Sequence, residues 1–324
     1  MKYDDVIPIV NEIIASYTIK LTVRQIFYRI ISPPYQLFAN TMQNYKQFDR
    51  LLTRARERGD IDWERIEDRA RTTIGGDFGY SSPEDFINSQ IYWFKNSWDS
   101  YTRRVWDEQP YYVEVWVEKD ALATLFSEVA DEFRVVTFPS RGYSSFTKIM
   151  EALTDSRRFP RYIRMGKPII ILHFADLDPS GFNMTEDIRK RLFDKGYIVK
   201  ALRRCFSNKE LDEIKEAYKR SGMEKRSMVT VQRCALTIEQ VRKYNLPPNP
   251  TKKADSRARR YISMFGDQCW ELDALEPTEL QRIIRESIQT WIDADKWNAT
   301  IQKIEKEKEE LKSKFEKVKI SFEQ

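Results

Sequence analysis

The 324-residue chain contains few of the residues that build disulfide frameworks or zinc sites: it has three cysteines and one histidine. The cysteines are scattered and odd in number, so we expect reduced thiols in a cytoplasmic protein. No run of about 18 apolar residues occurs, so the sequence predicts no membrane span. The N-terminus also lacks the charged and then apolar order of a signal peptide.

What the chain does contain is enough apolar surface for buried cores. Hydrophobic residues make up 41% of it and aromatic residues 13%, which excludes general disorder. Its length allows two domains and a tail. The formal net charge of +5 permits nucleic-acid binding without demanding it, so the positions of the charges say more than their sum.

The most distinctive motif is an Asp-x-Asp pair behind an apolar segment. Residues 168–174 predict a strand buried on both faces of a sheet. Asp176 and Asp178 follow two positions apart, so their side chains should point the same way. Pro179–Gly181 should then end the strand, and the serine within this triplet should cap a helix over 182–195.

A third carboxylate lies far upstream of this pair. Glu118 ends a predicted strand over 111–117 and begins a helical pattern that runs to Phe133. If the two strands are parallel neighbours, Glu118, Asp176 and Asp178 converge at the carboxyl edge of the sheet, where open α/β sheets place their sites. Three oxygen donors without a nearby histidine or thiol are typical of Mg²⁺. An ordinary strand-to-helix turn is the alternative explanation of the Asp-x-Asp pattern.

Residues 1–75 predict a compact group of three helices. Amphipathic spacing indicates one helix over 5–16 and a second over 23–31. Thr22 is a good N-cap for the second helix, and a Pro-Pro pair closes it.

The third helix is expected over 41–58 and should end at Gly59, because glycine commonly terminates helices. With residues 59–63 as a candidate wing, this order resembles a winged helix-turn-helix. Cations recur every four residues on this helix, so they form one cationic stripe that would contact DNA. A solvated face paired to Asp49 and Glu57 is the alternative. The stripe consists of Lys46, Arg50, Arg54 and Arg58.

The middle of the chain alternates between strand and helix patterns. After an aromatic-rich helical linker at 76–108, we expect a domain at 109–245. The alternation predicts an α/β fold with a Rossmann-like parallel sheet. The expected strands cover residues 111–118, 134–138, 168–175, 197–202 and 228–232.

Two further segments complete the chain. Residues 246–295 extend the α/β domain and include Lys252 and Lys253, which could contact phosphates, although an exposed loop would look similar. Residues 296–324 show apolar residues at heptad-like spacing among Lys and Glu, so we expect a helical tail that packs on a partner or on its own protomer.

Taken together, the motifs resemble those of a known family. Glu118-Lys119-Asp120-Ala121, Arg141-Gly142-Tyr143 and the Asp176–Gly181 segment resemble a Toprim domain. More narrowly, they resemble the topoisomerase VI A subunit and the related meiotic double-strand-break protein, because Val23–Tyr28 is similar to that family's Arg-x-Ile-Tyr/Phe-Tyr motif. The resemblance covers about residues 20–280.

The resemblance implies Mg²⁺-dependent cleavage of double-stranded DNA by a homodimer associated with the nucleoid. Tyr28 would be the nucleophile that forms a 5′-phosphotyrosyl link, and Arg24, one helical turn earlier, would stabilise the phenolate or the phosphate. Glu118, Asp176 and Asp178 would hold the metal. Lys119 and Arg141 would contact DNA, although Lys119 could be a surface residue at a helix start.

The chain also departs from the family pattern. About twenty residues precede the tyrosine-bearing helix, where larger A subunits carry an extension that docks on an ATPase B subunit. Ser144 stands where the family usually has proline, and no Gly-rich ATPase motif is present. We therefore expect a small stand-alone A-subunit homologue of the kind found in mobile elements, with no assured ATPase partner.

Two other functions stay open. A Toprim nuclease would hydrolyse DNA with metal-activated water and leave Tyr28 structural, as an aromatic residue among apolar neighbours on a helix usually is. A non-catalytic DNA-binding recombination accessory protein would keep only the fold. His173, before the Asp-x-Asp pair, is expected to be a hydrogen-bonded core residue and not a general base.

Overall fold

The computed structural model describes residues 1–67, 79–140, 146–220, 228–251, 255 and 257–318. Contacts divide the chain into two compact units. The first unit combines Met1–Arg71 with Tyr112–Trp291, and the second combines Thr72–Tyr111 with Ile292–Gln324. None of the described helices has both the length and the apolar character that crossing a membrane requires.

A four-stranded parallel sheet forms the centre of the first unit, which confirms the α/β prediction. The strand order is β2-β1-β3-β4, and β1 and β3 are buried along their whole length. Val117 pairs with Phe174, so β1 and β3 end at the same edge. The strands are β1 (Tyr112–Val117), β2 (Val136–Pro139), β3 (Ile169–Phe174) and β4 (Val229–Ala235).

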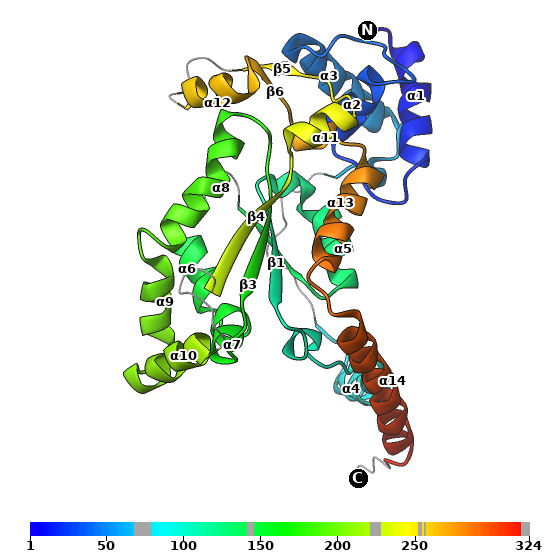
Figure 1. The fold of residues 1–324 in the computed structure, drawn as a ribbon. Helices are drawn as coiled ribbons and strands as arrows, with labels where there is room; N and C mark the ends of the chain where they lie inside the picture. The colour runs from blue at the N-terminus through cyan, green and yellow to red at the C-terminus, as the bar shows by residue number, and fades with distance from the viewer. Residues whose placement is uncertain (68–78, 141–145, 221–227, 252–254, 256, 319–324) are drawn as a thin grey trace. The chain divides into compact units, whose positions relative to one another are not determined.

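Helices cover both faces of this sheet (Figure 1). On one side, α5 packs on β1 and β2, and α13 packs on α5 and β4. On the other side, α8 packs on β4, and α9 contacts both α8 and α6. These helices are α5 (Ala123–Glu132), α6 (Phe146–Thr154), α8 (Pro179–Leu192), α9 (Tyr197–Cys205) and α13 (Pro277–Gln289).

Three helices form the N-terminal part, as predicted: α1 (Tyr3–Ala15), α2 (Val23–Ile31) and α3 (Met42–Arg58). Thr22 and Gln25 form a reciprocal capping box at the start of α2. Gly59 ends α3 with φ of 78°, a left-handed conformation that glycine adopts without a Cβ penalty. In the candidate wing, residues 59–62 contain no strand and Trp63 begins a 3₁₀ turn, η1 (Trp63–Arg65), so the winged form of this helical group stays a prediction.

One predicted strand is a helix. Residues 197–202 belong to α9, because their burial follows a helical period: Tyr197, Ile198 and Ala201 are buried while Lys200 is exposed. The short apolar segment alone could not distinguish the two periods.

The remaining elements of the first unit are short. They include a two-stranded antiparallel sheet, β5 (Asn249–Pro250) with β6 (Gln268–Cys269), and the 3₁₀ turn η6 (Leu272–Ala274). Leu177 forms an isolated antiparallel bridge with Trp270, so the segment after β6 lies beside the loop after β3. The other helices are α7 (Phe159–Arg164), α10 (Asn208–Arg220), α11 (Ile238–Lys243) and α12 (Ala258–Phe265).

The second unit joins the expected linker to the expected tail. It consists of α4 (Pro83–Asn96), two 3₁₀ turns, η2 (Ser97–Ser100) and η3 (Val105–Asp107), and the long helix α14 (Ala294–Glu316). The rings of Phe94 and Phe315 lie 4.9 Å apart, and Arg103 forms a bidentate pair with Glu307 at 2.6 and 2.7 Å. The tail therefore packs on its own protomer.

Gly181 allows α8 to begin beside the carboxyl edge of the sheet. A Cβ at this position would overlap the carbonyl oxygen of Asp176 and lie 2.9 Å from Glu118 Oε2. We predict that Gly181→Ala lowers the free energy of unfolding by about 2 kcal/mol, because neither neighbour can move freely. Gly79→Ala is the control, with nothing within 4 Å, and should change it by less than about 0.5 kcal/mol. Equal urea midpoints for the two variants would contradict the crowding.

Candidate functional site

The three predicted carboxylates lie together at the carboxyl edge of the sheet. Glu118 directly follows β1, and its Oε2 accepts a hydrogen bond from the amide of Asp176 at 3.3 Å. Asp178 is the N-cap of α8, where its Oδ1 accepts from the amide of Gly181 at 2.6 Å. The prediction of Ser180 as the cap was therefore wrong: the second aspartate of the pair caps the helix, because it is the last extended residue before it.

Asp176 is held by groups from a distant part of the chain. Its Oδ1 accepts from the amide of Leu272 at 2.8 Å and lies 3.2 Å from the ammonium of Lys119. Asp176 and Asp178 have left the strand, since β3 ends at Phe174, so strand alternation does not set their directions.

Lys119 is the centre of an acidic cluster that the sequence analysis did not find. Its Nζ pairs with Asp176, with Glu271 at 3.2 Å, and closely with Asp273. Glu271 in turn forms a bidentate pair with Arg24 of α2. The available signal was an alternating Glu-x-Asp at 271–273, but no apolar strand pattern precedes it to indicate a sheet edge.

Burial sets the protonation behaviour of this edge. Burial, followed by the charges of Asp176 and Asp178, raises the pKa of Glu118 to about 7. Burial also raises the pKa of Asp176 to about 6, although the charge of Lys119 opposes this shift. For Glu271, burial acts upward, but Lys119 and Arg24 bring its pKa below the ordinary value. Added positive charge would therefore stabilise Glu118 and Asp176 in their ionised forms.

The three carboxylates supply suitable oxygen donors for a metal ion, but their arrangement is not that of a formed metal site. Among the described residues, no group of three or more His, Cys, Asp or Glu side chains is arranged to hold an ion. Glu118, Asp176 and Asp178 each use one carboxylate oxygen in the contacts above, and the other oxygen has no hydrogen-bond partner among the described residues. These hard oxygen donors fit Mg²⁺ in kind, and Mg²⁺ binding stays a prediction.

The predicted nucleophile is completely buried. Tyr28 of α2 has no exposed surface, and its hydroxyl accepts a hydrogen bond from Asn249 Nδ2 at 2.9 Å. Burial raises the pKa of Tyr28 well above its usual value of 10. The guanidinium of Arg24 lies 5.4 Å from the centroid of the Tyr28 ring and 4.2 Å from that of Tyr45. Both predicted catalytic residues are therefore beside the acidic cluster of their own chain.

A cavity of about 420 Å³ opens onto the cluster. Asp176 and Asp178 line it, and so does Asn249, whose amide is bonded to the Tyr28 hydroxyl. Tyr28 itself does not line the cavity. Asn249 therefore stands between the cavity and the tyrosine.

The other predicted residues differ in how the structure places them. The cationic stripe on α3 is exposed, and no ion pair joins it to Asp49 or Glu57 within the described part of the chain. Arg141, Lys252 and Lys253 lie outside the described residues. His173 is buried with Nδ1 2.9 Å from Thr185 Oγ1, and burial lowers its pKa to about 3, as suits a core residue.

The chain was compared with known proteins in three ways. A scan against protein-family models found no matching family, and searches of curated proteins and of solved structures found no similar protein. The function must therefore be argued from the geometry of the site and from the sequence motifs.

The raised pKa of Glu118 predicts a specific dependence of stability on pH. The unfolded carboxyl ionises near 4.5 and the folded one near 7, so the folded state loses stability as the pH rises through this window. In metal-free buffer at pH 8, the free energy of unfolding from urea titrations should be higher for Glu118→Gln than for wild type by about 3 kcal/mol, and this difference should disappear toward pH 4.5. Glu57→Gln, an exposed control, should show no such trend. A gap that is constant with pH would contradict the assignment.

The exposed stripe on α3 predicts a salt-dependent interaction with DNA. Arg50→Gln/Arg54→Gln should reduce the slope of log K against log salt by about two units, because each phosphate contact contributes about 0.9. The measurement is fluorescence anisotropy with a labelled duplex at several salt concentrations. Lys215→Gln/Lys219→Gln on α10 removes the same charge from exposed positions and is the control. If the slope of log K against log salt were equal for the two variants, the stripe would be a solvated face that does not contact DNA.

Proposed function

We propose that the protein is a Mg²⁺-dependent DNA-cleaving enzyme of the type IIB topoisomerase A-subunit kind, with a winged-helix domain and a Toprim domain. The observation that carries the proposal is a continuous chain of ion pairs from Arg24 through Glu271 and Lys119 to Asp176. This chain couples the helix that carries Tyr28 to the carboxyl edge of the sheet. In this proposal, two motifs that are 148 residues apart in sequence, at Tyr28 and Asp176, belong to one site.

The chemistry follows from the groups around Tyr28. Its oxygen would form a bond to phosphorus while the bond from phosphorus to the 3′ oxygen breaks, and the phenol proton would end on that 3′ oxygen. The amide of Asn249 donates to the phenol oxygen and would stabilise a phenolate there, as would the charge of Arg24. Glu118, Asp176 and Asp178 would hold Mg²⁺, which supplies charge stabilisation at the phosphate.

Because Tyr28 is fully buried in this structure, cleavage of DNA would require a conformation in which its hydroxyl is accessible. The hydroxyl reaches the cavity only if Asn249 or α2 moves, because Asn249 lies between them. In the proposed homodimer, Tyr28 of one protomer would act with the carboxylates of the other, which requires α2 to leave its own cluster. Freeing α2 would break both the Arg24–Glu271 pair and the hydrogen bond from Arg29 to the carbonyl oxygen of Ala274.

Hydrolysis by metal-activated water is the second candidate. The same burial favours it, because Asp176 and Asp178 line an open cavity while the tyrosine hydroxyl does not. In that case Tyr28 would be a core residue that anchors β5 through Asn249.

Tyr28→Phe separates the two mechanisms. Under transesterification it should abolish both DNA cleavage and the covalent protein–DNA adduct detected on denaturing gels, because the nucleophile is lost. Folding should survive at a cost of about 1 kcal/mol, the usual value of one hydrogen bond. Tyr45→Phe, the neighbouring tyrosine under Arg24, should retain cleavage. Cleavage by Tyr28→Phe with free 5′-phosphate ends would replace the topoisomerase proposal with the nuclease.

Asp176→Asn completes the experiment. It should abolish cleavage under either mechanism and leave duplex binding largely intact, because binding depends mainly on Lys and Arg contacts to phosphate. If this variant cleaved DNA at the wild-type rate, Asp176 would have no catalytic role in either mechanism.

A further inference from the structure

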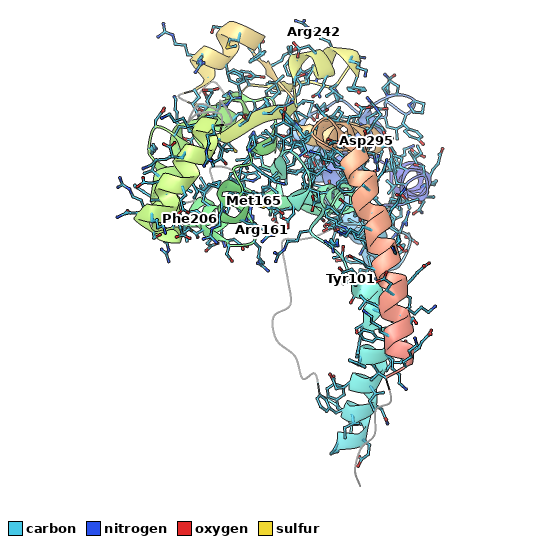
Figure 2. All side chains as sticks on the ribbon, turned by 60° about the horizontal axis from the view of Figure 1, so that its bottom comes forward. Tyr101, Arg161, Met165, Phe206, Arg242 and Asp295 are labelled. Atoms are coloured by element: carbon cyan, nitrogen blue, oxygen red, sulfur yellow. The ribbon has the colours of Figure 1, made fainter. Side chains whose placement is uncertain are left out.

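A second basic surface lies on the first unit, formed by the end of α6 and by α7 and α9. These elements surround a cavity of about 670 Å³. Its charged lining consists of Arg161, Arg164 and Arg204, and Ser156 adds a hydroxyl. We call this surface the basic groove. Figure 2 shows three of its lining residues, Arg161, Met165 and Phe206, close together.

The segments that line the groove carry mostly positive charge. Residues 154–167 and 197–206 contain eight arginines and lysines and one acidic residue, Asp155. The whole chain has a formal net charge of only +5, so the remainder of the protein is net negative. The positive charge is thus concentrated here, as in surfaces that bind polyanions.

Ion pairs neutralise little of the charge on two of the groove arginines, Arg164 and Arg204. Arg164 pairs with Glu210 at 2.8 Å, but both side chains are exposed, and exposed pairs contribute little and exchange readily. Arg204 is exposed and pairs with no carboxylate among the described residues. Arg158 points elsewhere, to the buried Glu114 of β1, and so anchors the start of α7 to the sheet. The two groove arginines on α7, Arg161 and Arg164, therefore belong to a helix that is anchored to the sheet.

The groove is distinct from the acidic cluster. The chain passes from α7 into the amino end of β3, whereas Asp176 follows the carboxyl end of the same strand. A six-residue strand spans on the order of 20 Å, so the two surfaces lie at opposite edges of the sheet. One duplex phosphate could not occupy both.

We propose that the basic groove binds the phosphate backbone of duplex DNA at a second contact, remote from the cleavage centre. Arginine guanidinium groups present paired donors that match phosphate oxygens, and serine hydroxyls are common phosphate donors. The concave shape accommodates a convex backbone. The choice of DNA as the ligand rests on the proposed function.

The test is duplex binding by Arg161→Gln/Arg164→Gln/Arg204→Gln. Each phosphate contact that is lost should lower the slope of log K against log salt by about 0.9, which corresponds to about an eightfold loss of affinity at 0.1 M salt. We expect a slope reduced by two to three units. Lys209→Gln/Lys215→Gln/Lys219→Gln on α10 removes the same charge nearby from exposed positions and should change affinity less than threefold. If the triple arginine variant does not fold, Arg204→Glu alone, at an exposed position, should still weaken binding about tenfold or more.

The outcomes separate this inference from the proposed function. If wild type binds and cleaves DNA but the groove and control variants behave alike, the groove inference is overturned and the proposed function stands. If wild type binds no duplex DNA, both are overturned. Loss of affinity for an RNA duplex alone would also overturn the inference. With DNA bound at saturating protein, the groove variant should cleave at the wild-type rate, since no groove residue belongs to the cleavage centre.

Discussion

The candidate site depends on the ion pairs that the ammonium group of Lys119 forms. It lies among Asp176, Glu271 and Asp273, three carboxylates from segments about 95 residues apart. Without a cation between them, these carboxylates would repel one another, and this repulsion would oppose the backbone contacts that hold the segment after β6 beside the loop after β3. Through Glu271 the same charge also holds Arg24 and thereby α2. Lys119 thus contributes to the position of α2, together with the hydrogen bond from Arg29 to the carbonyl oxygen of Ala274 and the hydrogen bond from Asn249 to Tyr28.

This dependence explains which parts of the fold could be predicted. Local signals predicted the helices around Thr22 and Gly59 and the buried strands before Glu118 and Asp176, because capping, termination and apolar runs act within a few residues. The partners of Lys119 could not be predicted, since Glu271 and Asp273 meet it only through tertiary folding. The strand predicted at 197–202 failed because a six-residue apolar segment fits both periods. The DNA-cleaving role of the site rests on motif resemblance and stays a prediction.

Tyr28 illustrates a conflict between packing and chemistry. A phenol with no exposed surface, bonded to Asn249, contributes to a stable core and is poorly disposed to ionise. A nucleophile needs the reverse of both properties. The structure describes the state in which packing prevails. The ion pair between Arg24 and Glu271, the hydrogen bond from Asn249 and the hydrogen bond from Arg29 to the carbonyl oxygen of Ala274 all hold α2 in this state.

The second unit has a consequence for how the chain is connected. Its two halves, 72–111 and 292–324, flank the segment that contains the entire sheet. Gln109 and Asp293 hydrogen-bond to each other where the chain leaves and re-enters this unit, at 2.8 and 3.3 Å. The contacts between the two halves of this unit therefore close residues 112–291 into one long loop of polypeptide. Closing such a loop has an entropy cost that grows with its length, and the contacts between the two halves of the second unit must offset that cost. The second unit therefore forms only when residues from both ends of this loop have met.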